Sequence, residues 1–326
     1  MQDTLLDKIH RTEMDIMREI DRICRKHNLT YFLSCGTLLG AVRHKGFIPW
    51  DEDMDIMMPR EDYEQFLKVA PDELPPQLML DSYPQNPRYF NPFAKVRNRN
   101  TLFAIRALQN YDGPQGLWID IFPMDYADGR NTEDTLKRER KIGICRAGIC
   151  IKRGIFDWNA LPAKRKPVYR LFSLLPERFL WKQIEKAHLE CRGEKKMFVM
   201  FGTDYRCERL TMPVDWFFPA KEAPFEEENF FVPNDSDAVL KQIYGDYSYN
   251  NQHLKPGQGR DPFSIFNNLY LPYGSTFEFI NTGHPVNLSI HGRVRNQRED
   301  YSDGVQNPDN LRSIKFMVTD SGLKSV

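Results

Sequence analysis

The spacing of apolar positions predicts alternating helices and strands along most of the chain. Apolar residues recur at helical spacing over residues 4–26, which predicts one amphipathic helix that packs on a following sheet. Residues 31–33 form an apolar run typical of a short buried strand, and residues 53–58 alternate between polar and apolar as a strand does. The same patterns predict a helix over 60–69, ended by prolines at 71, 75 and 76, and strands over 78–80, 93–97 and 116–125.

The later part of the chain is predicted to be mainly helical and then β-rich. Helices are predicted over residues 132–153, 163–173, 177–192 and 235–244, with short β segments at 197–202 and 216–219. After a Gly- and Pro-containing linker, strands are predicted near Tyr270 and over 277–280, 286–290 and 314–318. Together these patterns predict an α/β (α+β) fold, a mixed sheet flanked by helices with a small β-rich C-terminal appendage.

Composition narrows the class of protein. The 326 residues suffice for one large domain or two ordinary ones. Lys and Arg number 45, as do Asp and Glu, so no excess positive charge indicates nucleic-acid binding. The six cysteines form no Cys-x-x-Cys pair, which argues against a zinc site and a disulfide scaffold. With no signal peptide and no apolar run long enough to span a bilayer, we expect a cytoplasmic protein.

Two carboxylates share one face of the strand predicted at 53–58. Asp53 and Asp55 lie two residues apart, and at about 4 Å and an effective dielectric near 20 they would repel by roughly 4 kcal/mol. A divalent cation converts that repulsion into binding, and oxygen ligands suit Mg²⁺, with Mn²⁺ as the alternative. Before them, Gly36 breaks a strand and Thr37 is predicted to cap a helix whose N–H groups favour phosphate. This combination indicates phosphoryl or nucleotidyl transfer, whereas an isolated Asp-x-Asp would more often be a solvated strand end.

Other charged residues extend the candidate site. Asp120 lies inside the apolar run 116–125, so we predict a third metal-ligating acid, with a structural salt bridge as the alternative. Asp125 is predicted to be a cap or loop residue. Lys95 and Arg97 share one strand face, which is either a solvated edge or a cationic pair facing phosphates. The basic residues between 164 and 182 are interpreted as a solvated face rather than a polyanion groove.

Two stretches, Gly36–His44 and Ile48–Ile56, resemble the LicD family of phosphocholine transferases and their relatives, which include the fukutin-related proteins. The resemblance extends to Lys95-x-Arg97, to Ile-Asp-Ile-Phe-Pro around Asp120 and to Tyr-Gly-Asp-Tyr at 244–247, and covers about residues 5–250. Thr37 stands where Ser is usual, and Glu227 stands where the family has Gly, which puts the local turn in question.

The resemblance implies a nucleotidyltransferase-like catalytic domain over residues 1–250, with a helical insert at about 132–192 that frames the acceptor side, and an extension over 251–326. It implies Mg²⁺-dependent transfer of a phosphocholine-like phospho-alcohol group from a CDP-activated donor. The acceptor would be a sugar hydroxyl of a cell-surface glycan or lipid-linked oligosaccharide, as in lipopolysaccharide biosynthesis, with peripheral membrane association through a lipid-linked acceptor.

The resemblance also assigns roles to individual residues. Asp53 and Asp55 would hold the metal, and Asp120 would complete its shell or accept the acceptor's proton. The Gly36-Thr37 turn would bind phosphate, and the cationic residues Arg43, Lys95 and Arg97 would neutralise developing charge.

Three other functions stay open. A nucleotidyltransferase would move a nucleotide to a small molecule and release pyrophosphate. A glycosyltransferase also uses Asp-x-Asp, but the Gly-Thr turn argues against it. A non-catalytic glycan-binding or scaffold protein is the alternative from another class, and the presence of all three acids argues against that function.

Overall fold

A computed structural model defines the fold. It describes residues 5–247 apart from 50, 104–110, 131, 156–157, 159–162, 192–193 and 204, together with 280–281, 316–319 and 322–325.

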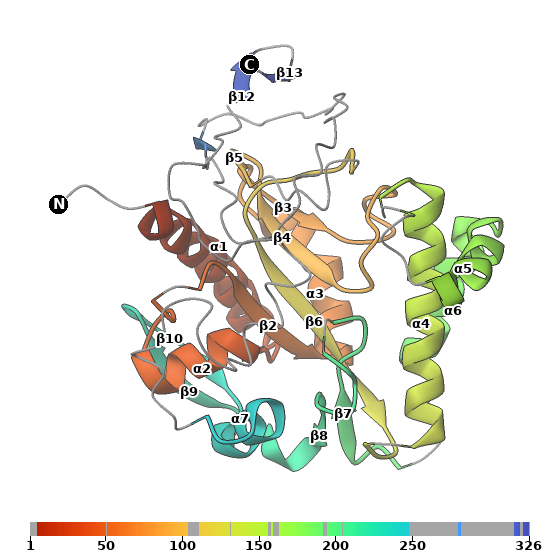
Figure 1. The fold of residues 1–326 in the computed structure, drawn as a ribbon. Coiled ribbons are helices and arrows are strands. Elements are labelled where there is room, and N and C mark those ends of the chain that lie inside the picture. Colours follow the sequence, from red (N-terminus) through yellow and green to blue (C-terminus); the bar gives the residue numbers. More distant parts are fainter. Residues whose placement is uncertain are drawn as a thin grey trace, which may run out of the picture.

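The centre of the molecule is a seven-stranded mixed sheet, which confirms the predicted fold class (Figure 1). Five strands follow the order β1-β2-β6-β4-β3, with bounds Phe32–Leu33, Met54–Pro59, Trp118–Ala127, Ala94–Asn98 and Leu78–Asp81. Strand β2 runs parallel to β6, and the other pairings are antiparallel. The far end of β6 pairs with β7, Met197–Val199, which pairs with β8, Thr211–Pro213.

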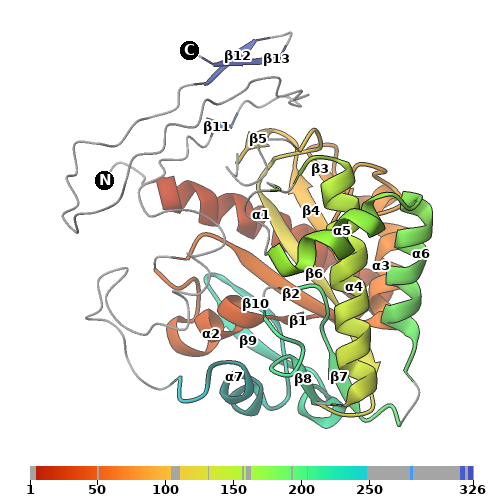
Figure 2. The same cartoon turned by 45° about the vertical axis from the view of Figure 1, so that its right-hand side comes forward.

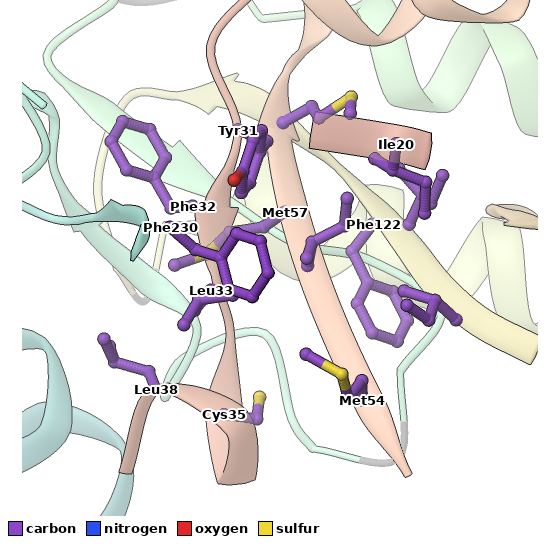
Figure 3. Close-up of a cluster of buried hydrophobic side chains, with 14 of the residues drawn as sticks. Ile20, Tyr31, Phe32, Leu33, Cys35, Leu38, Met54, Met57, Phe122 and Phe230 are labelled. Atoms are coloured by element: carbon purple, nitrogen blue, oxygen red, sulfur yellow. The ribbon is translucent and has the colours of Figure 1, made fainter. Parts of the chain in front are cut away.

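Four helices and one hairpin pack around this sheet. The helices are α1 (Leu5–His27), α2 (Cys35–His44), α3 (Arg60–Glu73) and α7 (Ser236–Tyr244), and the hairpin is β9–β10 (Lys221–Phe225 and Glu228–Val232). Their apolar side chains form one continuous core with the strands. Figure 3 shows a part of this core, in which Leu33 of β1, Met57 of β2 and Phe122 of β6 are fully or almost fully buried. The periodicity of α1 is explained by this packing, because Ile16, Ile20 and their neighbours on the apolar stripe are buried.

A second layer of helices lies on one side of the sheet, as Figure 2 shows. It contains α4 (Glu133–Lys152), a 3₁₀ turn (Ala163–Arg165), α5 (Lys166–Ser173) and α6 (Glu177–Leu189), with an apolar cluster of its own. Thr132 caps α4 by accepting a hydrogen bond from the N–H of Thr135. The buried Arg138 ties this layer to the sheet, because it donates to the carbonyl oxygens of Tyr126, Ala187 and His188 at 2.7–2.8 Å.

Two predicted elements differ from the structure. Residues 216–219 do not form a β segment, because the strand in this region is β8 and the chain then turns as a 3₁₀ helix over Val214–Trp216. Pro213 ends the strand, since proline has no N–H for the next rung of the ladder. Helix α3 continues past Pro71 to Glu73 rather than ending at 69, and the N–H of Leu74 still bonds to Ala70 O at 2.9 Å.

The C-terminal part contributes three short strands to the described residues. Strand β11 (Ile280–Asn281) pairs with β5 (Thr101–Leu102), and β12 (Phe316–Thr319) pairs with β13 (Gly322–Ser325) in a two-stranded antiparallel sheet. The strands predicted near Tyr270 and over 286–290 lie outside the described residues, so the division of the chain at residue 250 stays a prediction. No helix within the described ranges is long and apolar enough to cross a bilayer. All six cysteines are free thiols.

Candidate active site

Strand register brings predicted site residues from three strands into one row. Asp55 of β2 is paired with Asp120 of the parallel strand β6, and Asp120 is paired with Lys95 of the antiparallel strand β4. Residues in register on neighbouring strands share one face of the sheet and lie about 5 Å apart. Lys95 forms an ion pair with Asp120 across this row. Asp53 precedes β2 by one residue, and it interacts electrostatically with Asp55 and Asp120.

The start of α2 is bonded directly to the backbone of Asp55. The N–H of Ser34 donates to Asp55 O at 2.9 Å, and the N–H of Asp55 donates to Thr37 Oγ1 at 2.8 Å. The predicted capping role of Thr37 is therefore wrong. Ser34 occupies the N-cap position, and the Thr37 hydroxyl holds β2 against the helix instead. Gly36 lies in the first turn of α2, where N–H groups have no acceptor within the helix.

The acids of this site are half-buried together and repel one another. Burial raises the pKa of Asp53 to about 6, and the charge of Asp120 adds to that rise. Burial raises the pKa of Asp55 well above its ordinary value, with the charges of Asp53 and Asp120 next in importance. Asp51 was not predicted as a site residue. Its pKa is also raised well above the ordinary value, first by burial and then by the charge of Asp53. Lys95 is the counter-ion in this cluster, although burial lowers its pKa.

Helix α1 adds a carboxylate that sequence reasoning missed. Glu13 is only 1% exposed, and its Oε2 atom has no hydrogen-bond partner. Burial raises the pKa of Glu13 well above its ordinary value, with Asp53 and Asp51 as the next causes. One turn earlier, His10 donates from Nε2 to Asp51 O at 2.7 Å and stacks on Phe47, so this face of α1 lies against the site. The sequence signal that could have revealed Glu13 is an acidic residue at a position of the apolar stripe of α1.

Two tyrosines approach the acids from α7 and the segment before β8. The rings of Tyr205 and Tyr244 lie 6.3 Å apart in an edge-on arrangement. Burial raises the pKa of both phenols, with Cys35 of α2 as the next cause for each. The charge of Asp55 also raises the pKa of Tyr205, and the charge of Asp51 also raises the pKa of Tyr244. In the Tyr-Gly-Asp-Tyr motif, Tyr244 thus lies within electrostatic reach of Asp51, whereas Tyr247 donates to Asp237 Oδ1 at 2.7 Å on the surface.

The remaining predicted residues lie in different surroundings. Arg97 is buried and donates to Asp81 Oδ2 at 2.6 Å and to Gly116 O at 3.1 Å, so it has partners within the fold. The interpretation of Lys95 and Arg97 as a solvated edge is wrong, since both are buried. Arg43 lies in the last turn of α2, about 9 Å along the axis from Thr37. Substrate contact by Arg43 and Arg97 stays a prediction.

The donor chemistry of this cluster suits a divalent cation. Carboxylate oxygens of Asp53 and Asp55 are the hard ligands that Mg²⁺ prefers, and Glu13 has a buried oxygen without a partner. Among the described residues, however, no three acidic, His or Cys side chains are already arranged around a common point. Asp120 is engaged by Lys95 instead. The residues therefore fit a metal ion by charge and ligand type, and its binding stays a prediction.

Asp125 was predicted to be a cap or loop residue, and this is wrong. It lies within β6 and is 1% exposed, because β6 continues to Ala127 through its pairing with β7. Arg60 donates from Nε to Asp125 Oδ1 at 2.6 Å, and His188 Nδ1 donates to Oδ2 at 2.6 Å. This buried network joins α3, β6 and α6, and it lies five residues along β6 from Asp120.

The turn at Glu226 and Glu227, where the sequence departs from the family pattern, is well defined. Glu226 adopts a left-handed conformation with φ 52°. Its N–H donates to Lys45 O at 2.7 Å, and its Oε1 accepts from the N–H of Phe47 at 3.0 Å. The hairpin β9–β10 thereby holds the loop that follows α2 and leads to the acids.

Comparisons with known proteins agree with these features. Residues 28–146 match the family model described as LicD/FKTN/FKRP, nucleotidyltransferase domain. The lipopolysaccharide cholinephosphotransferase LicD of Haemophilus influenzae is 28% identical over 261 residues, which cover 77% of this chain and 93% of that protein. Uncharacterized proteins of Rickettsia typhi and Rickettsia prowazekii are 43% and 41% identical over 56 residues, 17% of this chain and 18% and 21% of theirs. Residues 28–146 therefore match a LicD/FKTN/FKRP nucleotidyltransferase domain, and the distant similarity to LicD extends over most of the chain.

Proposed function

We propose that the protein transfers a phosphocholine-like phospho-alcohol group from a CDP-activated donor to a sugar hydroxyl of a glycan or lipid-linked oligosaccharide. The observation that carries this proposal is the row Asp55, Asp120 and Lys95 beside the N-terminus of α2. In this row acids and a cation lie beside the N–H groups at the start of α2, which supports the binding of phosphate there. The distant relationship to a lipopolysaccharide cholinephosphotransferase supports the choice of substrates.

The proposed reaction assigns a role to each residue of this row. An acceptor hydroxyl attacks the phosphorus that carries the alcohol, the bond from that phosphorus to the bridging oxygen of CMP breaks, and CMP leaves. The N-terminus of α2 at Gly36 and Thr37 binds phosphate oxygens, and Lys95 neutralises charge. Asp120 accepts the hydroxyl proton or would serve as a further metal ligand, and Asp53 and Asp55 are the residues that would hold Mg²⁺ or Mn²⁺. The metal, when bound, supplies electrostatic stabilisation of the phosphoryl oxygens.

Release of CMP tests the proposal directly. Purified protein is incubated with CDP-choline, CDP-ribitol or CDP-glycerol, with and without Mg²⁺, in the presence of a crude glycan extract. We expect metal-dependent CMP from one donor, which also identifies the transferred group. Absence of CMP from all three donors, with folded protein, would refute the proposal.

The same samples discriminate the alternatives. Incubation with nucleoside triphosphates and small alcohols would release pyrophosphate if the protein were a nucleotidyltransferase. Retention of the glycan extract without any nucleotide consumption would identify a glycan-binding protein instead.

Glu13→Gln tests whether the buried acid of α1 belongs to this site. We expect a decrease in kcat/KM of about 10- to 100-fold and a higher Mg²⁺ concentration for half-maximal activity, because supporting groups of a metal site contribute that much. Stability without metal should be kept or increased, because the substitution removes a carboxyl group whose ionised form is destabilised by burial and by the charges of Asp53 and Asp51. Thermal unfolding with and without Mg²⁺ gives the second measurement.

Glu19→Gln is the matched control, because it lies on the same helix in an exposed pair with Arg22. It should change neither activity nor the Mg²⁺ requirement. Wild-type kinetics in Glu13→Gln would exclude Glu13 from the site.

A further inference from the structure

Exposed large apolar side chains gather on the helical layer formed by α5 and α6. Within the described residues seven such side chains are exposed, and five of them lie between residues 168 and 189. They are Val168, Leu171, Leu174, Phe179 and Leu189. Three of them, Val168, Leu171 and Leu174, lie within seven residues at α5, and Leu171 is 62% exposed and Leu174 is 75% exposed. These three side chains form a local apolar surface. We call it the α5 surface.

The orientation of α5 explains why this face is open. Phe172 and Leu175 point to the other side and pack against the apolar cluster around α4. A Cβ added at Gly148 of α4 would lie 3.0 Å from Phe172 Cβ, so the two helices are in close contact there. Leu171 and Leu174 lie about one helical turn apart and are the two most exposed of these side chains, whereas Val168 lies one turn before Phe172 and is 42% exposed. The attachment of α5 thus leaves Leu171 and Leu174 exposed as an apolar stripe.

The charges around this stripe are almost all positive. Between residues 163 and 182 the chain has six basic residues, Lys164, Arg165, Lys166, Arg170, Arg178 and Lys182. The one acid in that range, Glu177, is paired with Arg153. The chain as a whole has no net charge, so this is a local excess. All six basic side chains are exposed or half-exposed, which agrees with the predicted solvated face.

We propose that the α5 surface docks on an anionic lipid bilayer. An interfacial helix combines an apolar face that enters the acyl boundary with Lys and Arg that contact anionic head groups, and the α5 surface has both. A second copy of the chain fits less well, because two such surfaces would bring like charges together. Helix α5, with eight residues, lies on a membrane rather than spanning it. The proposal stands independently of the transfer reaction.

Vesicle flotation tests the docking. The full chain is mixed with vesicles of phosphatidylcholine alone or of phosphatidylcholine with phosphatidylglycerol. We expect binding to the anionic vesicles that weakens as salt is raised. The double variant Leu171→Ser/Leu174→Ser should bind at least about tenfold more weakly, since two exposed leucines lose their burial in lipid. Lys164→Gln/Arg165→Gln/Arg170→Gln should lose the preference for anionic vesicles.

Val42→Ser is the matched control, because Val42 is an exposed apolar residue outside this surface. It should bind vesicles like the wild type. The leucine variant should keep its circular dichroism spectrum and its CMP release with a soluble acceptor. Equal vesicle binding by the leucine variant and the wild type would overturn the proposal. So would absence of binding to anionic vesicles by the wild type, and a concentration-dependent dimer that the leucine substitutions abolish would then identify a second copy of the chain as the occupant.

Discussion

Asp53→Asn and Asp55→Asn are each expected to lower CMP release by about 10³-fold, equivalent to roughly 4 kcal/mol of transition-state stabilisation. The two acids lie beside Asp120 at the N-terminus of α2, where the proposed reaction needs a metal ligand. Asparagine keeps the size of the side chain and removes its charge. The measurement is kcat/KM for the donor identified by the CMP assay, together with the Mg²⁺ dependence of that rate.

These variants should lose activity and yet, without metal, be at least as stable as the wild type. Burial and neighbouring charges raise the pKa of Asp53 to about 6, so the folded protein binds more protons there than the unfolded chain does. Without metal, stability therefore falls as pH rises from about 4 through 6. Asp53→Asn removes that loss and should unfold at an equal or higher temperature than the wild type at pH 7.5.

Magnesium separates the variants from the wild type. In the wild type, Mg²⁺ at 100 times its dissociation constant should stabilise the fold by about 2.7 kcal/mol, and this increase should be absent in Asp53→Asn. Asp112→Asn is the control, because Asp112 is an exposed acid paired with Arg88. Wild-type activity in Asp53→Asn or Asp55→Asn, or a lower unfolding temperature without metal, would contradict the assignment.

Asp125→Ala is expected to destabilise the protein by about 3–5 kcal/mol, because removing one partner of a buried ion pair leaves the others without compensation. Asp125 accepts from both Arg60 and His188, and all three groups are buried or nearly so. Urea unfolding followed by tryptophan fluorescence measures the loss. Asp215→Ala, an exposed acid outside this network, should change stability by less than about 0.5 kcal/mol. A loss below about 1 kcal/mol in Asp125→Ala would show that the network contributes little.

The same network predicts loss of stability in acid. Burial alone would raise the pKa of Asp125, but Arg60 and His188 outweigh it and hold the pKa below its ordinary value. Burial lowers the pKa of His188, against the opposing effect of Asp125. Both groups therefore bind fewer protons in the folded state than in the unfolded chain. Stability should fall below about pH 6.5 through His188 and further below about pH 4 through Asp125. His188→Gln should flatten the first of these two declines.

Local sequence patterns were sufficient for the elements that carry the site. The period of two predicted the strand that carries Asp55, and the Gly36-Thr37 turn predicted a helix close to the observed start of α2, because these features depend on neighbouring residues alone. The role of Thr37 was not predictable in this way. Its hydroxyl accepts from Asp55, 18 residues away, and only the pairing of β1 with β2 brings these residues together.

Long-range register determined which charges meet. Asp120 and Lys95 were each identified from one strand, but their ion pair depends on the antiparallel pairing of β4 with β6. Arg97 shares a strand face with Lys95 and yet bonds to Asp81, because β3 supplies an acid beside it. Alternation within one strand cannot reveal the partner that a neighbouring strand provides.

The sequence by itself determined the fold class, the amphipathic helices and the stretch with the candidate acids, since each follows from periodicity or from a continuous motif. Only the tertiary structure decided that Glu13 of α1 joins those acids, that Asp125 binds Arg60 and His188, and that the apolar stripe of α5 faces outward. The physical reason is that burial and charge pairing depend on what packs against a residue. That neighbour comes from a distant part of the chain, and helix or strand spacing does not specify it.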